Sequence, residues 1–198
     1  MKRIAMLALA GFVAFGLNSC ILDPKEDKPG DPPPVPYKDL TQRDDVLFNL
    51  QKAYNERNLD RYDELLDADF VFFFSNTDYP ETVPYDQWGR AAELGANRNM
   101  FDPTFSRPPL EPVSDIDLQL TYAPGEDKWV EVTPPDPVKY PDEVWYEKIV
   151  TYSINIKAGS TDFVGNNIQA SFTVRLATGE DSREYWRIVI WRDDTGSK

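Results

Sequence analysis

Three segments in the second half of the chain alternate apolar and polar residues, and this alternation constrains the fold more than any other feature. They span residues 144–156, 168–176 and 185–191. In the middle segment, polar residues alternate with one apolar face made of Ile168, Ala170, Phe172, Val174 and Leu176. Because successive side chains of a strand point to opposite faces, these segments predict an antiparallel sheet with one covered face. Gly159 and Gly179 lie between the segments and indicate hairpin turns.

Helical patterns dominate the preceding part of the chain. Thr41 is expected to cap a first helix that ends at Asn58 in a left-handed conformation, and Asp60 is expected to cap a short second helix. The aromatic run Phe70–Phe74 predicts a strand buried on both faces, and residues 85–98 predict a third helix. Two shorter strands are expected at residues 115–122 and 129–133. Helices followed by a long antiparallel sheet define an α+β fold.

The N-terminus has the layout of a secretory signal. Lys2 and Arg3 precede an unbroken apolar run of 14 residues from Ile4 to Leu17. A helix needs about 20 apolar residues to cross a bilayer core of roughly 30 Å, so this run is too short to span it. Cys20 follows directly and is the only cysteine of the chain, which excludes a disulfide within it.

The segment Leu17-Asn18-Ser19-Cys20 resembles the lipobox of bacterial lipoproteins. The resemblance implies cleavage before Cys20, lipidation of its thiol, and residence in the cell envelope. Ile21 in the next position, in place of aspartate, favours the outer membrane by the same analogy, on either its periplasmic or its surface face. A plain secretory signal with an incidental cysteine, or an uncleaved membrane anchor, is the alternative.

A proline-rich segment separates this cysteine from the folded part. Six of the 14 residues from Asp23 to Pro36 are prolines, which predicts a solvated, semi-rigid spacer. At about 3.1 Å per residue, such a spacer reaches roughly 40–50 Å. We therefore expect three parts: a signal peptide over residues 1–19, a lipidated cysteine and tether over residues 20–37, and one α+β domain over residues 38–198.

Charge and composition exclude several functions. The formal net charge is −13, and loss of Lys2 and Arg3 with the signal takes it to −13 − 2 = −15. Such a chain repels phosphate backbones, so we expect no nucleic-acid partner. The sequence contains no histidine, which excludes Ser-His-Asp and Cys-His catalysis and histidine-bound zinc. The acidic stretches at Asp23–Asp31 and Asp193–Asp194 lack the spacing of a calcium loop, so we expect neither metal nor cofactor.

Two segments resemble NTF2-like domains, including SnoaL-like proteins. Residues 58–70, with Leu65-Leu66 shortly before Phe70, resemble the passage from the second helix into the first strand. Residues 186–193 resemble the last strand of the same superfamily. The resemblance covers most of residues 40–194 and implies a cone, related to the cystatin fold, in which a bent antiparallel sheet wraps the helices and leaves a pocket. NTF2-like domains include isomerases, dehydratases, dimerisation modules and binding proteins, so the fold leaves the activity open.

Candidate chemistry rests on one carboxylate and three tyrosines. Ketosteroid-isomerase relatives use a carboxylate base together with tyrosine and a protonated acid as hydrogen-bond donors. This chain offers Tyr54, Asp69, Tyr146 and Tyr152 for such roles. A turn role for Asp69 and aromatic core or rim roles for the tyrosines are the favoured interpretations. Strand cations could also line a site for an anionic ligand, although a solvated strand surface is favoured: Lys148, Arg175, Arg187 and Arg192.

Three functions are compatible with these features. We favour a lipid-anchored envelope protein whose domain is a non-catalytic binding or accessory module. The alternatives are a SnoaL-like or ketosteroid-isomerase-like pocket enzyme that uses Asp and Tyr, and a structural dimerisation subunit of an envelope assembly. The expected partners are the membrane, through the lipid, and either a small apolar ligand or a second copy bound through the sheet; five tryptophans, 11 phenylalanines and 10 tyrosines make both plausible.

Overall fold

A computed structural model describes residues 35–75, 84–109 and 111–193. The helices are α1 (Arg43–Glu56), α2 (Leu59–Leu65) and α3 (Arg90–Phe101), with a 3-10 turn η1 (Glu126–Lys128). The strands are β1 (Leu66–Phe73), β2 (Gln87–Gly89), β3 (Val113–Thr121), β4 (Val130–Val132), β5 (Trp145–Ala158), β6 (Thr161–Thr178) and β7 (Glu184–Asp193). No helix among these residues is long and apolar enough to cross a membrane.

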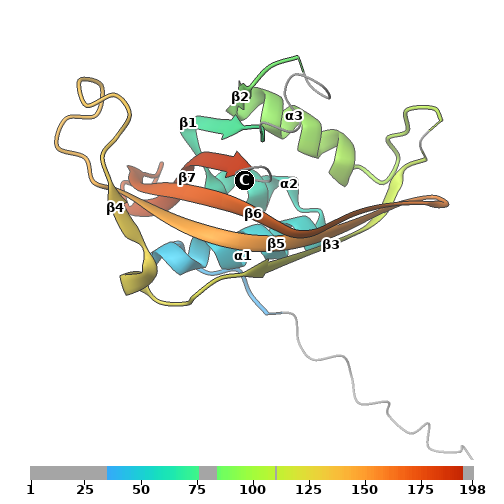
Figure 1. Ribbon diagram of the computed structural model, residues 1–198, viewed down its shortest axis with the longest axis horizontal. Coiled ribbons are helices and arrows are strands. Elements are labelled where there is room, and N and C mark those ends of the chain that lie inside the picture. The colour runs from blue at the N-terminus through green and yellow to red at the C-terminus, as the bar shows by residue number, and fades with distance from the viewer. Residues whose placement is uncertain (1–34, 76–83, 110, 194–198) are drawn as a thin grey trace, which may run out of the picture. The chain divides into compact units, whose positions relative to one another are not determined.

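The strands form one curved sheet in the order β2-β1-β7-β6-β5-β3, and β4 pairs with part of β5 (Figure 1). All neighbours are antiparallel except β1 and β7, which run parallel. The long β5–β6 hairpin carries the alternation that the sequence shows, and Gly159 occupies its turn with φ of 60°. The predicted fold class, an α+β cone with N-terminal helices on a curved and mostly antiparallel sheet, is confirmed.

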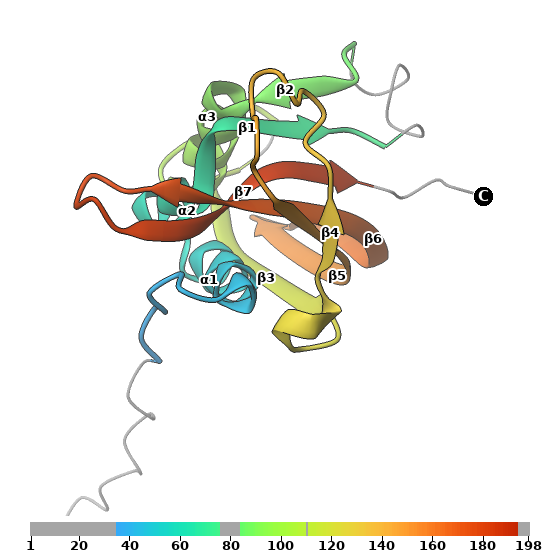
Figure 2. The ribbon, with the colours of Figure 1, turned by 90° about the vertical axis from the view of Figure 1, so that its left-hand side faces the viewer.

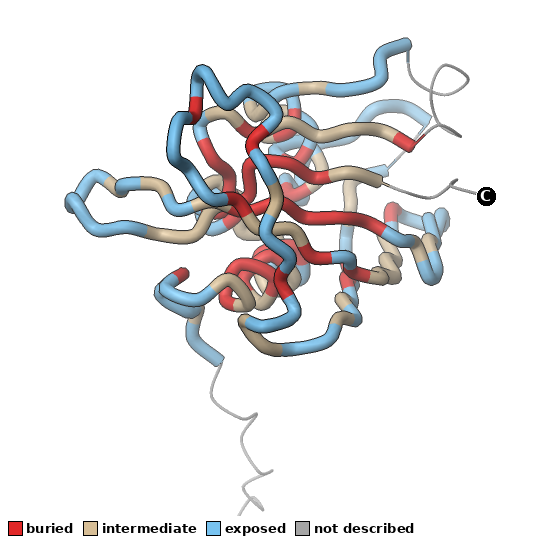
Figure 3. The backbone as a smooth tube through the Cα atoms, turned by 60° about the vertical axis from the view of Figure 1, so that its left-hand side comes forward, coloured by how far each residue is buried: buried red, intermediate tan, exposed pale blue. Residues whose placement is uncertain are grey.

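The helices cover one face of the sheet and form the main core with it (Figures 2 and 3). The predicted apolar face of β6 lies in this core, where Ala170, Phe172 and Val174 are fully buried. Burying each side chain the size of valine or phenylalanine contributes about 1.5–3 kcal/mol. The core residues of the helices are Val46, Leu47, Leu50, Ala53, Tyr54, Tyr62, Leu65 and Phe101.

A second, smaller cluster lies on the opposite face of the sheet. The consecutive β7 residues Ile190 and Trp191 point to opposite faces of the sheet, so Trp191 belongs to the main core and Ile190 to the second cluster. Residues 133–144, which connect β4 to β5, pack over this outer face through Tyr140 and meet Trp145 there, at 4.9 Å between ring centroids. The outer cluster, Tyr140, Trp145, Val189 and Ile190, is thus covered by a loop and not by a helix.

The helix ends differ from the expected positions. Gln42, and not Thr41, is the N-cap residue of α1. The backbone N–H of Gln42 donates to the Asp45 carboxylate at 3.1 Å. Arg57 takes the left-handed conformation expected of Asn58, with φ of 52°. Asn58 instead caps α2 in place of Asp60, because its side chain accepts from the Arg61 N–H at 3.1 Å. The chain can thus turn directly from one helix into the next.

The third helix begins later than predicted. Residues 87–89 form β2, which pairs with the end of β1, and α3 starts only at Arg90. The reason is aromatic packing across the two strands: the Trp88 ring lies 5.9 Å from Phe72 and 4.9 Å from Phe74. This contact joins the start of the predicted helix to a strand that precedes it in the sequence, and it overrides the local helix propensity.

Candidate functional site

The four candidate residues do not meet in one place. Tyr54 of α1 and Tyr152 of β5 lie on the helix-covered face, where their rings contact Trp191 at 6.4 and 6.5 Å. Tyr146 lies at the start of β5, where the centroid of its ring is 5.6 Å from that of Trp186. Asp69 of β1 belongs to the opposite face and is described below.

Tyr146 stands in a cationic environment near the start of α1. The guanidinium of Arg43 lies 3.8 Å from the centroid of its ring, and the Arg43 Nε donates to Glu126 at 2.5 Å. The ring is thus packed between an arginine and Trp186 at one end of the sheet. A stacked ring of this kind positions the arginine.

The residue best placed for interior chemistry is Glu93 of α3, which the sequence reasoning missed. Its side chain is buried and accepts hydrogen bonds from the Tyr62 hydroxyl, from Trp88 Nε1 at 2.8 Å and from Asn97 Nδ2 at 2.7 Å. Burial raises the pKa of Glu93 above its usual value, although the three donors act in the opposite direction. A buried carboxyl next to tyrosine is the type of group that holds or moves a proton.

The tyrosines around Glu93 are held in their neutral form. Tyr54 and Tyr62 are buried side by side, with ring centroids 5.2 Å apart. Burial raises the pKa of both hydroxyls well above their usual value, and the nearby Glu93 carboxyl raises them further. Tyr62 donates to Glu93, so this hydroxyl and this carboxyl satisfy each other.

The polar character of Glu93 and Asn97 explains why this face of the helix was missed. Charged and amide residues in a predicted helix are normally assigned to its solvated surface. In α3, however, Glu93, Asn97 and Phe101 follow one another at intervals of four and are the buried residues of the helix. The i, i+4 spacing of Glu93 and Asn97 ahead of a buried phenylalanine was the available signal.

The raised pKa of Glu93 predicts a specific pH dependence of stability. Between its ordinary value of 4.5 and its higher value in the fold, the folded state binds more protons than the unfolded state. The contribution of protonated Glu93 to the free energy of unfolding is therefore complete below about pH 4.5. It is lost as pH rises through the pKa of Glu93 in the folded state. Glu93→Gln lacks this titration, so the unfolding free energy of the native chain relative to this variant should fall from pH 4 to pH 8.

Urea unfolding at pH 4, 6 and 8 measures this difference. The exposed carboxylate variant Glu131→Gln, treated identically, supplies the baseline for general charge effects. A difference between the native chain and Glu93→Gln that stays level, or grows with pH, would contradict a raised pKa.

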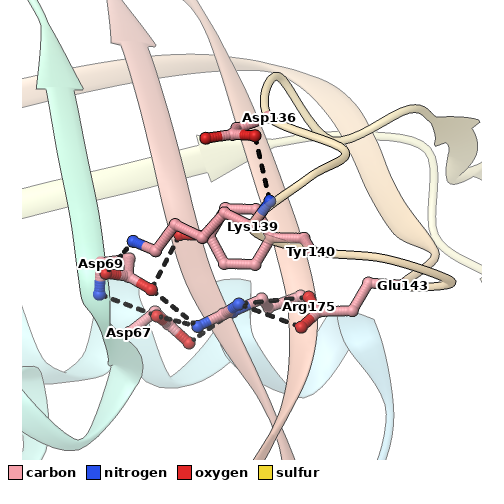
Figure 4. A network of polar contacts seen from close by, with 7 residues as sticks. All are labelled: Asp67, Asp69, Asp136, Lys139, Tyr140, Glu143 and Arg175. Carbon is pink, nitrogen blue, oxygen red and sulfur yellow. Dashed lines mark hydrogen bonds and ion pairs between the residues drawn. The ribbon is translucent and has the colours of Figure 1, made fainter.

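On the outer face, a polar network surrounds Arg175 of β6 (Figure 4). Its guanidinium bonds both oxygens of Asp67, with Nε at 2.9 Å from Oδ2 and Nη2 at 2.8 Å from Oδ1. The Asp67 side chain is only 1% exposed. Glu143, from the covering loop, pairs with Nη1 of the same arginine at 3.1 Å. Burial alone would lower the pKa of Arg175, but these carboxylates raise it, so the site holds a permanent charge.

Asp69 belongs to this outer network. It accepts from Lys139 Nζ at 2.7 Å, from the Tyr140 hydroxyl at 2.8 Å and from Arg175 Nη2 at 3.2 Å. The hydrogen bonds from Lys139 and Tyr140 lower the pKa of Asp69 below its usual range. The structure thus places this carboxylate as an ion-paired anchor for the loop, away from the interior tyrosines.

The strand cations are also dispersed. Lys148 of β5 is buried beside Asp44 at the start of α1, whereas Arg175 faces the outer side of the sheet. Arg192 lies over the ring of Phe73, 4.6 Å from its centroid. In the part of the chain that the structure describes, no group of three or more carboxylate, cysteine or histidine side chains is placed to hold a metal ion. The stretch Asp23–Asp31 lies outside the described residues.

No protein-family model matches this sequence, and no curated protein sequence matches it. Several solved structures are similar to it. An NTF2-like protein of unknown function in nutrient uptake from Rhodospirillum rubrum is 14% identical, with a TM-score of 0.45 over 77% of this chain and 96% of its own. An NTF2-like protein from Cytophaga hutchinsonii is 14% identical, with a TM-score of 0.41 over 77% and 93%.

A third similar structure comes from Thiobacillus denitrificans. It is a candidate association domain of calcium/calmodulin-dependent protein kinase type II, 17% identical, with a TM-score of 0.44 over 79% of this chain and 96% of its own. TM-scores below 0.5 at such identities imply no activity, ligand or partner for this chain.

Proposed function

We propose that this protein is a lipid-anchored binding or accessory module of the bacterial cell envelope and performs no catalysis. The observation that carries the proposal is the internal pairing of the groups best suited to acid–base work. Glu93 accepts from three neighbouring side chains, and Asp69 is paired with Lys139, Tyr140 and Arg175. Groups engaged in this way stabilise the fold, and a substrate would have to compete with these internal partners for them.

The anchor in this proposal is the thiol of Cys20. Its support is the sequence alone: a basic start, a 14-residue apolar run and the lipobox-like Leu17–Cys20 segment. One acyl chain holds a protein only marginally, whereas two or more anchor it stably, so the three chains of a lipoprotein cysteine suffice. We place the protein at the outer membrane, with the proline-rich tether between the lipid and the acidic domain.

Cys20→Ser should release the protein from the membrane fraction. The serine cannot carry the thioether-linked lipid, and the tether that follows is too polar to associate with a bilayer by itself. Membrane fractionation together with incorporation of labelled fatty acid measures both steps. Ser19→Ala, which leaves the cysteine in place, is the matched control. Fatty-acid labelling that persists in Cys20→Ser would contradict the proposed anchor.

For the domain, we propose a small apolar ligand as the partner. The support is the set of aromatic side chains packed on the helix-covered face, where the Trp191 ring meets Phe72 at 5.4 Å, Phe172 at 4.8 Å and Tyr54 at 6.4 Å. Aromatic surroundings of this kind favour apolar over charged ligands. Association of two copies through the sheet is the alternative, supported by exposed apolar side chains on its strands, such as Ile149 of β5, which is 61% exposed.

A proton-transferring enzyme is the second candidate function, because Glu93 is a buried carboxyl with a raised pKa beside Tyr62. Exchange of α-protons into D2O, followed by NMR on a set of cyclic ketones, separates the two. A non-catalytic module should give the same exchange rate as its Glu93→Gln variant. Exchange that is faster with the native chain than with this variant would assign catalysis to Glu93.

A further inference from the structure

The residues just before α1 form neither helix nor strand, yet they are fixed to the domain at several points. Asn49 of α1 is buried, and its carboxamide bonds both backbone groups of Lys38. Its Oδ1 accepts from the Lys38 N–H at 2.9 Å, and its Nδ2 donates to the Lys38 carbonyl at 2.8 Å. A neighbouring strand would supply two bonds of this kind, so one side chain holds the segment as a strand would.

The side chain of Lys38 is also held by α1. Its Nζ lies 3.3 Å from the Asp45 carboxylate and 4.6 Å from the centroid of the Phe48 ring. Asp45, Phe48 and Asn49 are three and four residues apart and therefore share one face of the helix. The backbone and the side chain of this lysine are thus both engaged, although 46% of the side chain is exposed.

Tyr37 is held from its ring and from its hydroxyl. The hydroxyl donates to the Glu56 carboxylate at 2.8 Å. Lys52 Nζ lies 4.9 Å and the Arg61 guanidinium 5.2 Å from the centroid of the tyrosine ring. Lys52 also pairs with Glu56. Cations at such distances are attracted to an aromatic face, so residues of α1 and α2 together fix this tyrosine.

Leu40 joins the segment to the sheet. Its side chain is buried in the main core, and its carbonyl accepts from the backbone N–H of Trp186 in β7 at 3.0 Å. Leu40 also has a left-handed backbone, with φ of 59°. A residue as large as leucine seldom adopts this conformation, which persists only where the surroundings fix it. The turn that leads into α1 is therefore held by the fold.

We propose that residues 37–40 form a clasp, held shut by Asn49, that protects the junction between tether and domain from proteolysis. The first residues of a domain are easily cleaved unless they are tied down, because a protease needs a locally unfolded backbone. Five of the eight residues from Pro29 to Pro36 are prolines, but none follows between Tyr37 and α1. The clasp thus begins where the prolines, which restrict the backbone, come to an end.

Trypsin, which cleaves after lysine and arginine, is a direct probe of the clasp. Between Cys20 and α1 the susceptible bonds are those after Lys25 and Lys38, because Lys28 precedes a proline that blocks cleavage. The two cuts leave domains of different mass, which mass spectrometry separates. The ratio of their initial rates reports on the clasp and is independent of the amount of protease.

The test is brief digestion of the full-length chain in mild detergent. Asn49→Ala should raise cleavage after Lys38, relative to cleavage after Lys25, roughly ten-fold or more, because two bonds are lost and cleavage follows the population of the open form. Asn55→Ala is the matched control and should leave the ratio unchanged. It removes two equivalent bonds from the same helix, but these go to the backbone of Leu118 in β3.

A second variant keeps the test decisive if Asn49→Ala does not fold, as judged by near-UV circular dichroism. Glu56→Ala lies outside the cleaved sequence and removes the acceptor of the Tyr37 hydroxyl, so it should raise the same ratio roughly three-fold. A folded Asn49→Ala chain with the ratio of Asn55→Ala would overturn the proposal. If only Glu56→Ala folds, an unchanged ratio in that variant would do so.

The use of the clasp to fasten the domain to a lipid rests on the proposed anchor at Cys20, whereas its effect on cleavage does not. The two proposals therefore fail in different ways. A chain without the lipid would be missing from the membrane fraction before any trypsin is added, and its cleavage ratios would be unchanged. A clasp that does not protect the junction would alter the ratios and leave membrane association intact.

Discussion

Arg175→Met should lower the free energy of unfolding by about 3–5 kcal/mol, the usual cost of removing one partner from a buried ion pair. Methionine leaves the Asp67 carboxylate, whose side chain is 1% exposed, with only the Asp69 N–H at 2.8 Å among the bonds described for it. Glu143 loses its arginine as well, so one contact that holds the loop over the outer face disappears. Urea denaturation followed by tryptophan fluorescence measures the loss.

Two further variants separate charge from geometry at this site. Arg175→Lys keeps the charge but cannot form the two parallel bonds to Asp67, so it should fall between the native chain and Arg175→Met. Arg183→Met removes a side chain that is 76% exposed and paired with Asp181, and it should leave stability almost unchanged. An Arg175→Met variant as stable as Arg183→Met would mean that Asp67 is not a buried charge.

The sheet could be predicted from the sequence because alternation is a local signal. Each long segment specifies its own buried face, and the middle of the face predicted for residues 168–176 packs in the core, whereas Leu176 at its end is 44% exposed. The alternation says nothing about what covers the other face. Ser171 and Thr173 were expected on the polar side of the strand, yet both are buried there beside the outer cluster.

The polar sites escaped prediction because their partners are distant in sequence. Arg175 and Asp67 are 108 positions apart, and Lys148 and Asp44 are 104 apart. A single sequence shows each of these residues as an isolated charge, and isolated charges on strands are usually solvated. Asp69 illustrates the same limit: it was expected in a turn, but it lies within β1, and its pairing with Lys139 depends on how residues 133–144 fold back over the sheet.

The β3 edge shows what the tertiary structure adds to a residue with an ordinary sequence context. Gln51 and Asn55 look like surface residues of an amphipathic helix, and that is how such a pattern is normally interpreted. In the structure their side chains bond the backbone of Leu120 and Leu118 in β3, and these bonds follow only from the register of α1 against β3. Neither helix propensity nor strand alternation contains that register.

Asp44→Ala should destabilise the fold as strongly as Arg175→Met, by about 3–5 kcal/mol. Asp44 receives hydrogen bonds from Lys148 Nζ, from Trp129 Nε1 at 2.8 Å and from the Gly125 N–H at 2.6 Å. The Lys148 side chain is 3% exposed, and without Asp44 its charge keeps only backbone carbonyls and two aromatic rings. The Asp44 carboxylate also lies in the first turn of α1, where its negative charge interacts favourably with the positive end of the helix dipole.

The variant at the other end of this pair gives the contrasting result. Lys148→Met removes the buried charge together with its desolvation cost and fills similar space, so it should cost far less than Asp44→Ala. Burial opposes ionisation of Asp44, but the hydrogen bonds from Lys148, Gly125 and Trp129 outweigh it and lower its pKa. The stabilisation by Asp44 is therefore fully present above its ordinary pKa of 3.8 and is lost as pH falls below that value and through the lower pKa of the folded state.

Denaturation at pH 3 and pH 7 checks both statements on one set of proteins. The gap in stability between the native chain and Asp44→Ala should be wide at pH 7 and narrower at pH 3. Asp39→Ala, at an exposed position shortly before the same helix, should stay within about 0.5 kcal/mol of the native chain at pH 7. Lys148→Met that proved as destabilising as Asp44→Ala would contradict this account. The loss in Asp44→Ala would then not come from a lysine charge left without its partner, and the packing and hydrogen bonds of Lys148 would be what stabilises this end of α1.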